Sequence, residues 1–323
     1  HALLARDLVE CSFADRVFFC NSGTEAVEAA LKIARKWQRE NHPGEERPGI
    51  VACTGSFHGR TMGALSVTSR EKYRAPFEPL VPGVRFIPYN DIAAAREAIG
   101  PRTGAVIVEP LQGEGGVYPA EPAFLQALRA LCDEQGALLI FDEVQCGLGR
   151  TGRLWAHEDA GVAPDIMTLA KPLGGGLPLG AVLMTQRVAG CMHPGDHGST
   201  FAANPVICAA ARVVLRRITD PAFLPTVRER GAYLARQLAT LQARNPLVRE
   251  VRGCGMIWGI DLAVDAAPLV NRGYELGVIV TTAGDRVLRL VPPLVINERE
   301  IDEGITLLEQ VLATAEGPMT YGA

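Results

Sequence analysis

Long apolar runs are missing from this sequence. No uninterrupted hydrophobic stretch reaches the roughly 18 residues that a membrane-spanning helix needs, so we expect no membrane association. A concentrated basic tract is missing too: 32 Lys and Arg residues stand against 36 Asp and Glu residues, and the formal net charge is −4. We therefore expect no nucleic-acid partner. What remains is an ordinary globular composition, 48% hydrophobic and 21% charged, in 323 residues, which is enough for one large and one smaller domain.

Closely spaced cysteine pairs are also absent. The eight cysteines include no C-x-x-C pair, whereas zinc and disulfide frameworks need tighter spacing. The sequence therefore predicts reduced and mostly buried thiols, no metal site and a cytoplasmic location. The eight residues are Cys11, Cys20, Cys53, Cys132, Cys146, Cys191, Cys208 and Cys254.

The first ten residues, HALLARDLVE, have no initiator methionine and carry the pattern of the middle of an amphipathic helix. They have no basic start, long apolar core or small-residue cleavage site, which a signal peptide would show. We expect a chain whose front part is missing.

Short β-rich runs alternate with longer helical runs through the first two-thirds of the chain. Continuously apolar runs such as AVIVEP and ALLIFDE are typical of parallel strands that are covered on both faces. Such strands, alternating with helices of this length, predict an α/β fold with a mostly parallel, doubly wound sheet. The predicted strands are 16–20, 49–54, 84–88, 105–109, 137–141 and 165–170, and the predicted helices are 24–40, 92–99, 122–134 and 203–218.

The last third has a different order of elements. Helix 221–244 is followed by strands 249–252, 256–262, 278–282 and 287–291 and by helix 298–315, which predicts a compact α+β domain. Asp220-Pro221 interrupts the helical pattern before it. We therefore predict a large domain over residues 1–217 and a small C-terminal domain over residues 218–323.

Two polar residues end predicted strands. Lys171 is followed by a proline and a Gly-rich loop, so its amine could reach a bound ligand, although an isolated lysine of this kind is more often a surface residue before a turn. Asp142 ends a buried strand, where α/β sheets place their ligands. Its carboxylate could bind a metal, act as a base or pair with a protonated ring nitrogen of a cofactor, and a surface or helix-capping acid is the alternative.

Three further segments suggest binding functions. Ser22, Gly23 and Thr24 lie between a strand and a helix, where backbone N–H groups can bind a phosphate, or where they form a plain helix cap. The segment FHGRT could stack on a ring and bind a carboxylate, and its histidine is either a base or structural. GLGRTG at 147–152 matches G-x-G-x-x-G, but DEVQC separates it from the strand, which indicates a turn without a nucleotide.

Seven segments in order resemble the class III aminotransferases, which are fold-type I pyridoxal-phosphate (PLP) enzymes. They are NSGTEA, SFHGRT, EPLQGEGG, FDEVQCGLGRTG, LAKPLGGGLPLGA, HGSTFAANP and RLVPPLVI. SFHGRTMGALSVT, PLVPGVRFIPYND and VEPLQGEGGVYPA are most similar to the acetylornithine aminotransferase branch. The resemblance implies that residues 1–217 bind PLP and that the N-terminal part of the family fold is missing from this chain.

The resemblance also implies roles for individual residues. Lys171 would bond covalently to PLP and later move a proton, and Asp142 would pair with the pyridine nitrogen. Arg60 and Arg289 would bind substrate carboxylates, and Glu114 would cover Arg289 when an ω-amine enters. The other implied cofactor contacts are Ser22, Gly23 and Thr24 at the phosphate, Phe57, His58, Val144 and Gln145 around the ring, and Thr200 from a second subunit of a homodimer with shared active sites.

The reaction implied by the resemblance is transfer of the ω-amino group of N-acetylornithine to 2-oxoglutarate. It gives a semialdehyde and glutamate and belongs to arginine biosynthesis. The sequence leaves alternatives open: another ω-amino-acid substrate (ornithine, succinylornithine, 4-aminobutyrate or a carrier-linked intermediate of lysine biosynthesis), a PLP-dependent aminomutase, or a scaffold that binds PLP or dimerises without catalysis.

Overall fold

The computed structural model describes residues 1–315. They divide into two compact units. The first unit contains His1–Pro110, Ala120–Leu148 and Arg153–Asp220, and the second contains Leu111–Pro119, Gly149–Gly152 and the chain from Pro221 onward. The division into domains at residue 217 remains a prediction, and it does not anticipate the two short segments that the second unit takes from the first two-thirds of the chain.

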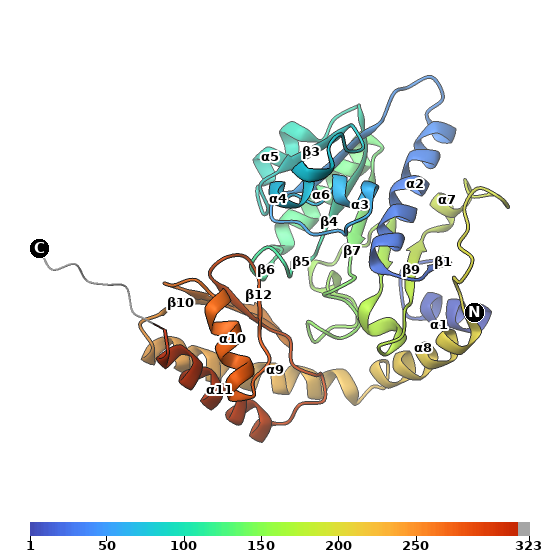
Figure 1. The fold of residues 1–323 in the computed structure, drawn as a ribbon. Coiled ribbons are helices and arrows are strands. Elements are labelled where there is room, and N and C mark those ends of the chain that lie inside the picture. The colour runs from blue at the N-terminus through green and yellow to red at the C-terminus, as the bar shows by residue number, and fades with distance from the viewer. Residues whose placement is uncertain (316–323) are drawn as a thin grey trace, which may run out of the picture. The chain divides into compact units, whose positions relative to one another are not determined.

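A seven-stranded sheet forms the centre of the first unit (Figure 1). Its strand order is β1-β9-β8-β7-β4-β2-β3, and every strand is parallel to the others except β9, which runs antiparallel to β1 and β8. The predicted α/β fold with a mostly parallel sheet is therefore confirmed. The strands are β1 (Arg16–Cys20), β2 (Gly49–Cys53), β3 (Val84–Ile87), β4 (Thr103–Val108), β7 (Leu138–Asp142), β8 (Ile166–Leu169) and β9 (Gly180–Met184).

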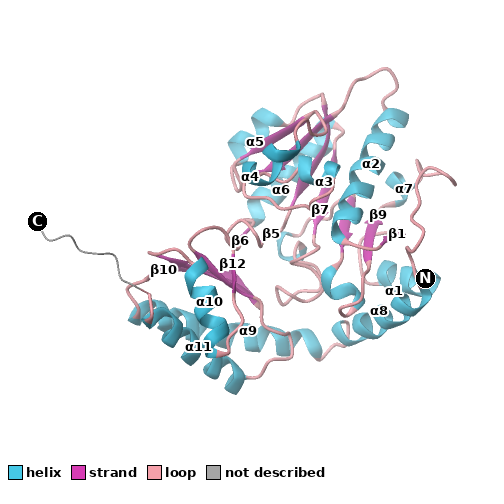
Figure 2. Cartoon of the chain, viewed as in Figure 1, coloured by secondary structure: helices cyan, strands magenta, loops and turns pink. Residues whose placement is uncertain are grey.

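Helices cover both faces of this sheet (Figure 2), because successive side chains of each strand point to opposite sides. In β4, Ala105 and Ile107 pack with α2, whereas Val106 and Val108 pack with α6. The helical elements are α1 (Ala2–Glu10), α2 (Gly23–Asn41), α3 (Met62–Ser66), α4 (Glu71–Arg74), α5 (Ile92–Ala98), α6 (Pro122–Gln135), α7 (Gln186–Ala189) and α8 (Pro205–Ile218), with 3₁₀ turns η1 (Ala75–Phe77), η2 (Glu158–Ala160) and η3 (Lys171–Gly174).

One edge of the sheet collects the carboxyl ends of the parallel strands. β1, β2, β4, β7 and β8 all end there, because they run in one direction. In open α/β sheets ligands bind outside this edge. The polar segments singled out in the sequence follow β1, β2, β7 and β8, so the fold gathers them at the same edge.

The second unit is built on a four-stranded antiparallel sheet of order β10-β11-β13-β12, and a two-stranded hairpin, β5–β6, belongs to the same unit. Residues from all three helices pack with Ile260, Leu262 and Leu288 on one face of the sheet. The elements are β5 (Leu111–Gln112), β6 (Tyr118–Pro119), α9 (Phe223–Arg244), β10 (Val248–Cys254), β11 (Ile257–Leu262), α10 (Ala267–Leu276), β12 (Thr281–Thr282), β13 (Val287–Leu290) and α11 (Glu298–Ala313).

One helix in this unit was not predicted, and one predicted strand has the wrong bounds. α10 forms between the predicted strands 256–262 and 278–282, with a proline in its first turn and Gly277 at φ 87° ending it. The predicted strand 278–282 shrinks to Thr281–Thr282, because only these two residues pair with β13. No helix within residues 1–315 is long and apolar enough to cross a membrane.

Candidate active site

Asp142 lies at the end of β7 with its carboxylate buried and oriented. Oδ1 accepts hydrogen bonds from the Val144 backbone N–H at 3.1 Å and from the Thr168 hydroxyl at 3.0 Å. Oδ2 lies 2.7 Å from Nδ1 of His58. Since a carboxylate oxygen can accept two hydrogen bonds, Oδ2 retains acceptor capacity for a ligand. The side chain is only 4% exposed, so this remaining lone pair lies in a low-dielectric setting where a cation is strongly favoured.

His58 supports that carboxylate from within the core. Its side chain is fully buried, and its backbone N–H donates to the Thr68 hydroxyl at 2.9 Å. Because Nδ1 faces the Asp142 carboxylate, Nδ1 carries the proton and donates. Nε2 is buried and has no hydrogen-bond partner among residues 1–315. The structure therefore places His58 in contact with the acid that the sequence analysis assigned to the ring nitrogen.

Lys171 follows β8, the strand next to β7. The register pairs Asp142 with Thr168, three residues before Lys171. The side chain of Lys171 is exposed and its backbone has φ 39°, in the left-handed region that non-glycine residues avoid. Strained backbone of this kind concentrates at functional sites. The amine thus stands at the carboxyl edge of the sheet, beside the strand that carries Asp142.

The N-terminus of α2 lies at the same edge, where it could bind an anion. Ser22 caps the helix by accepting from the Glu25 N–H at 3.3 Å, and the helix dipole is positive here. Gly23 is needed for packing, because a Cβ would lie 2.7 Å from Cγ1 of Val144. The Thr24 hydroxyl lies 2.7 Å from that of Thr61.

An aromatic platform carries Arg60. Its guanidinium carbon lies 3.7 Å from the ring centroid of Tyr73 and 5.5 Å from that of Phe57. The Phe57 N–H donates to the Glu109 carboxylate at 3.1 Å, which fixes the start of this turn. Arg60 is exposed, so its guanidinium group, which is held over these rings, is accessible to a carboxylate. No role was predicted for Tyr73, because nothing in its EKYR context distinguishes it from a surface residue.

A second buried acid organises the loop after β7. Glu143 accepts from the backbone N–H groups of Ala156 at 2.7 Å and His157 at 3.0 Å, and from the His157 ring nitrogen Nδ1 at 2.6 Å. Its side chain is fully buried. The carboxylate thereby closes the loop that begins with Val144 and Gln145, both half-buried. The contact between Glu143 and His157 was not predicted, because the two residues are 14 positions apart and no motif links them.

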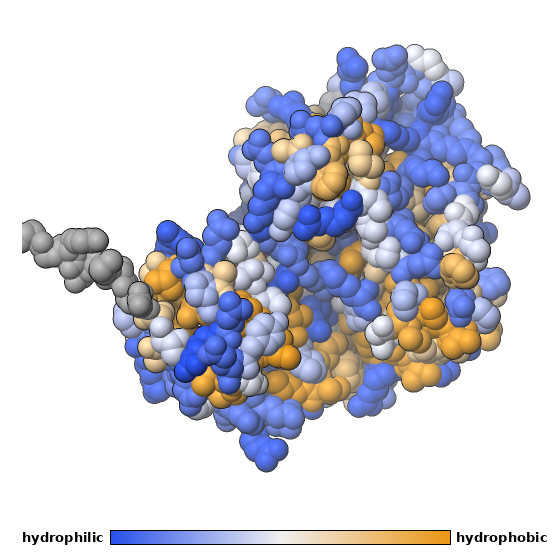
Figure 3. All heavy atoms as spheres, in the orientation of Figure 1, coloured by the Kyte–Doolittle hydropathy of each residue, from blue (hydrophilic) through white to orange (hydrophobic). Residues whose placement is uncertain are grey.

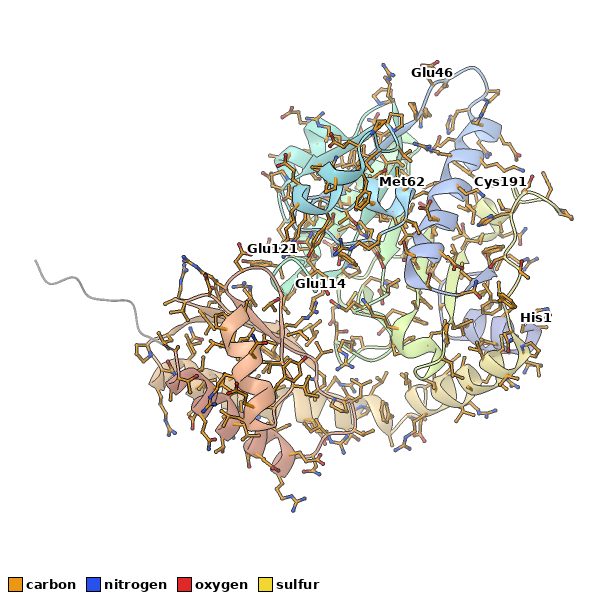
Figure 4. The ribbon with its side chains drawn as sticks, in the orientation of Figure 1. His1, Glu46, Met62, Glu114, Glu121 and Cys191 are labelled. Atoms are coloured by element: carbon orange, nitrogen blue, oxygen red, sulfur yellow. The ribbon has the colours of Figure 1, made fainter. Side chains whose placement is uncertain are left out.

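The second unit contains the ion pair between Glu114 and Arg289. Arg289, on β13, donates through Nη1 to Oε1 of Glu114 at 2.6 Å and to the Gly113 carbonyl at 2.9 Å, and through Nε to the Thr281 hydroxyl at 3.2 Å. Its side chain is 10% exposed and that of Glu114 is 32% exposed. Figure 4 labels Glu114 on the turn between β5 and β6. A mostly buried guanidinium whose acid is partly exposed can exchange that acid for a ligand carboxylate.

The first unit thus gathers Ser22–Thr24, Phe57–Arg60, Asp142–Gln145 and Lys171 along one sheet edge. Thr200 is exposed on a turn of this unit and follows Ser199, whose hydroxyl accepts from the Asn21 side chain at 2.8 Å. The segment 147–152 forms consecutive turns, as its Gly content predicts, and no nucleotide-type helix begins there.

Comparison with known proteins gives one consistent family. The model of the family described as aminotransferase class III matches residues 1–312. The mitochondrial acetylornithine aminotransferase of Alnus glutinosa is 57% identical over 313 residues, covering 96% of this chain and 69% of that protein.

Solved structures agree with this similarity. The N-acetylornithine aminotransferase of Stenotrophomonas maltophilia has a TM-score of 0.83 at 37% identity and covers 97% of this chain and 79% of its own. The ornithine aminotransferase of Toxoplasma gondii has a TM-score of 0.89 at 36% identity, covering 97% and 76% respectively. The similarity extends through the sequences of both units.

Proposed function

The chain belongs to the class III aminotransferases, which use PLP, and we propose that it transfers the ω-amino group of N-acetylornithine to 2-oxoglutarate. The products would be a semialdehyde and glutamate, as in arginine biosynthesis. The observation that carries this choice of substrate is the 57% identity to an acetylornithine aminotransferase over 96% of the chain.

The carboxyl edge of the first unit fits PLP on its own chemistry. The N-terminus of α2 supplies N–H donors and a positive dipole for a phosphate, and Asp142 retains acceptor capacity for a protonated ring nitrogen. Gly23 and Thr24 would hold the phosphate and Lys171 would hold the cofactor covalently. Val144 and Phe57 would lie on the two ring faces, and Gln145 would approach the phenolic oxygen.

Bound PLP supplies an aldehyde that accepts the amino group and a ring that spreads the electrons of the broken C–H bond. The chain itself has to keep that ring protonated and move one proton. The buried Asp142, oriented by His58 and Thr168, would stabilise the ring cation. Lys171 Nζ would take up the proton released from the δ-carbon of the amine.

Three charged residues would select the substrates. Arg60, exposed on its aromatic platform, would bind a substrate carboxylate. Arg289 would bind a carboxylate of glutamate or 2-oxoglutarate after Glu114 leaves it, and Glu114 would return when the amine substrate binds. The close ion pair supports this proposal, because it gives the arginine a partner for the half-reaction in which no second carboxylate is present.

We also propose a homodimer with shared active sites, to which Thr200 contributes across the interface. Large apolar side chains are exposed on α1, on α8 and on the turn before α8: Leu3 at 50%, Phe201 at 76%, Val206 at 73% and Val213 at 58%. Figure 3 shows apolar atoms gathered over α1 and α8. Apolar patches of this kind mark association surfaces. Sedimentation analysis of the protein and of Val206→Lys would test it, since a monomer at micromolar concentration in both samples contradicts the proposal.

A cytoplasmic location is part of the same proposal. All eight cysteines are free thiols, six of them buried, which agrees with a reducing compartment. Fractionation of the source cells with an antibody to the chain would check the location.

The function is tested with the PLP-loaded protein and a panel of amines. We expect glutamate to form from 2-oxoglutarate with N-acetylornithine as the best donor, and Lys171→Ala to abolish it while the circular dichroism spectrum is unchanged. Mass spectrometry after borohydride reduction should place a phosphopyridoxyl group on Lys171. Faster turnover of ornithine than of N-acetylornithine would contradict the substrate assignment, and turnover without 2-oxoglutarate would point to an aminomutase.

A further inference from the structure

Two arginines and one glycine form a single row across the sheet of the second unit. Gly259 on β11 is paired with Arg252 on β10 and with Arg289 on β13. Ile260, the next residue on β11, lies in the core beneath the helices. Since successive residues of a strand alternate in direction, the row faces away from that core.

The row carries the turn that contains Glu114. Arg252 donates through Nε to the carbonyl of Gly116 at 2.7 Å, and Arg289 donates through Nη1 to the carbonyl of Gly113 at 2.9 Å. One arginine therefore holds each half of the turn. Gly259 lies between them, and a Cβ there would stand 3.0 Å from Cβ of Val117 and 3.1 Å from the Gly116 carbonyl oxygen. The missing side chain lets the turn rest directly on the sheet.

The two arginines differ in how their charges are compensated. Arg252 donates to Oε2 of Glu250 at 2.6 Å and to Oδ2 of Asp261 at 3.3 Å, and its guanidinium carbon lies 4.0 Å from the Tyr118 ring centroid. The charge of Arg252 is thus compensated by acids on β10 and on the neighbouring strand β11, and not by Glu114. Arg289 has Glu114 as its ion-pair partner among residues 1–315. Arg252 is suited to stay in place, and Arg289 to change partner.

The turn does not hold its shape by backbone preference. Gly116 has φ 126° and Val117, which is fully buried, has φ 59°. A β-branched residue in this region is strained and persists only where surrounding contacts enforce it. The Arg252 hydrogen bond and the close contact with Gly259 are contacts of that kind.

We infer that Arg252 is a positioning residue for the exchange of Glu114 on Arg289. It fixes the Gly116–Val117 half of the turn, so that Glu114 can leave and return by side-chain movement while the backbone stays on the sheet. This inference rests on the proposed role of the ion pair. Loss of Arg252 would weaken the closed pair and so penalise the amine half-reaction, which needs Arg289 covered, more than the dicarboxylate half-reaction.

The test compares three variants of the PLP-loaded enzyme. Arg252→Gln removes the anchor, and Gly259→Ala lifts the turn from an independent direction. Glu250→Gln is the matched control, because it removes the charge of one partner of Arg252 while the bond to Gly116 remains. Each half-reaction is followed separately to obtain kcat and KM, and hydrogen exchange is measured for the peptide covering residues 111–119.

For both Arg252→Gln and Gly259→Ala we expect the KM for N-acetylornithine to rise about tenfold, near the effect of one lost hydrogen bond. The KM for glutamate and both kcat values should stay within about twofold, since the proton-moving groups are untouched. Hydrogen exchange of 111–119 should accelerate in these variants and not in Glu250→Gln.

Equal changes in both half-reactions, or unchanged exchange at 111–119, would overturn the inference. Should Arg252→Gln not fold, Gly259→Ala decides the question by the same criteria. A further variant, Arg289→Gln, distinguishes failure of the proposed role of the Glu114–Arg289 ion pair from failure of the proposed role of Arg252. If it leaves the KM for glutamate unchanged, the proposed role of the ion pair fails; if it raises that KM while the anchor variants change neither KM, only the role of Arg252 fails.

Discussion

Replacing Glu114 with glutamine should make the protein bind dicarboxylates more tightly. In the structure, a dicarboxylate that needs Arg289 has to displace a carboxylate held at 2.6 Å against a guanidinium that is only 10% exposed. A hydrogen bond to a charged group contributes about 1.5–3 kcal/mol. When both partners are charged, their Coulomb attraction adds to it, and a neutral amide loses that part. The Glu114→Gln substitution keeps the shape of the side chain but removes its charge.

The difference sets the expected magnitude. If the Glu114→Gln substitution weakens the contact with Arg289 that competes with the ligand by roughly 1 kcal/mol, the dissociation constant of a dicarboxylate should fall about fivefold. The amine half-reaction should respond in the opposite direction, because Arg289 then retains an uncompensated charge when no second carboxylate is bound. We expect its KM for N-acetylornithine to rise with kcat little changed.

Glutarate is a suitable probe, since it has two carboxylates and no amine. Its dissociation constant is measured by isothermal titration calorimetry on the PLP-loaded wild type, Glu114→Gln and Glu250→Gln, the last making the same change in net charge beside Arg252. Glutarate binding that is unchanged or weaker in Glu114→Gln, with Glu250→Gln like the wild type, would refute the reasoning that the pair competes with the ligand.

Three further predictions concern the first unit. His58→Leu should weaken PLP binding about tenfold, because the Asp142 carboxylate loses its 2.7 Å hydrogen bond. Equilibrium dialysis measures the affinity, and an unchanged value would rule out support of the acid by the histidine. Gly23→Ala should lower the free energy of unfolding by about 1–3 kcal/mol, because the new methyl group would lie 2.7 Å from Val144. Urea denaturation measures this free energy, and a wild-type value would show that Val144 moves aside freely. Burial raises the pKa of the Cys132 thiol to about 12, so the folded chain holds this proton more tightly than the unfolded chain does. The contribution of the protonated thiol to stability is complete below about pH 9 and is lost as the pH rises. Alkylation of Cys132 by iodoacetamide at pH 8 should therefore require unfolding, which peptide mass mapping would reveal.

The fold of the first unit could be predicted because most of its strands are apolar runs with clear ends in the sequence. Arg16–Cys20 has the predicted bounds, and the runs at β4 and β7 are apolar on both faces, as buried parallel strands require. The antiparallel strand β9 was not predicted, although its apolar run Gly180–Met184, which follows a Gly-rich loop, is as long as β1. Strand direction is a tertiary property that five residues do not encode.

The site was predicted in its residue types but not in its supporting contacts. The partners His58 and Asp142 are 84 positions apart, and Arg252 and Gly116 are 136 apart, so no spacing rule links them. Gly259 looked like any glycine in a strand; its importance depends on which turn lies over it. Residue roles inferred from the resemblance remain predictions until the variants above are measured.

The backbone of Lys171 has a consequence for how such sites can change. At φ 39° the backbone is least strained with glycine, and any residue with a Cβ lowers the stability of the fold by about 1 kcal/mol or more. Chain stability alone would therefore favour glycine at this position, and the amine that we propose for the bond to the cofactor opposes that change. If the proposed role of Lys171 holds, a related chain that has lost the chemistry should replace this lysine and become more stable by doing so. The identity of residue 171 would then indicate whether such a chain is still an enzyme.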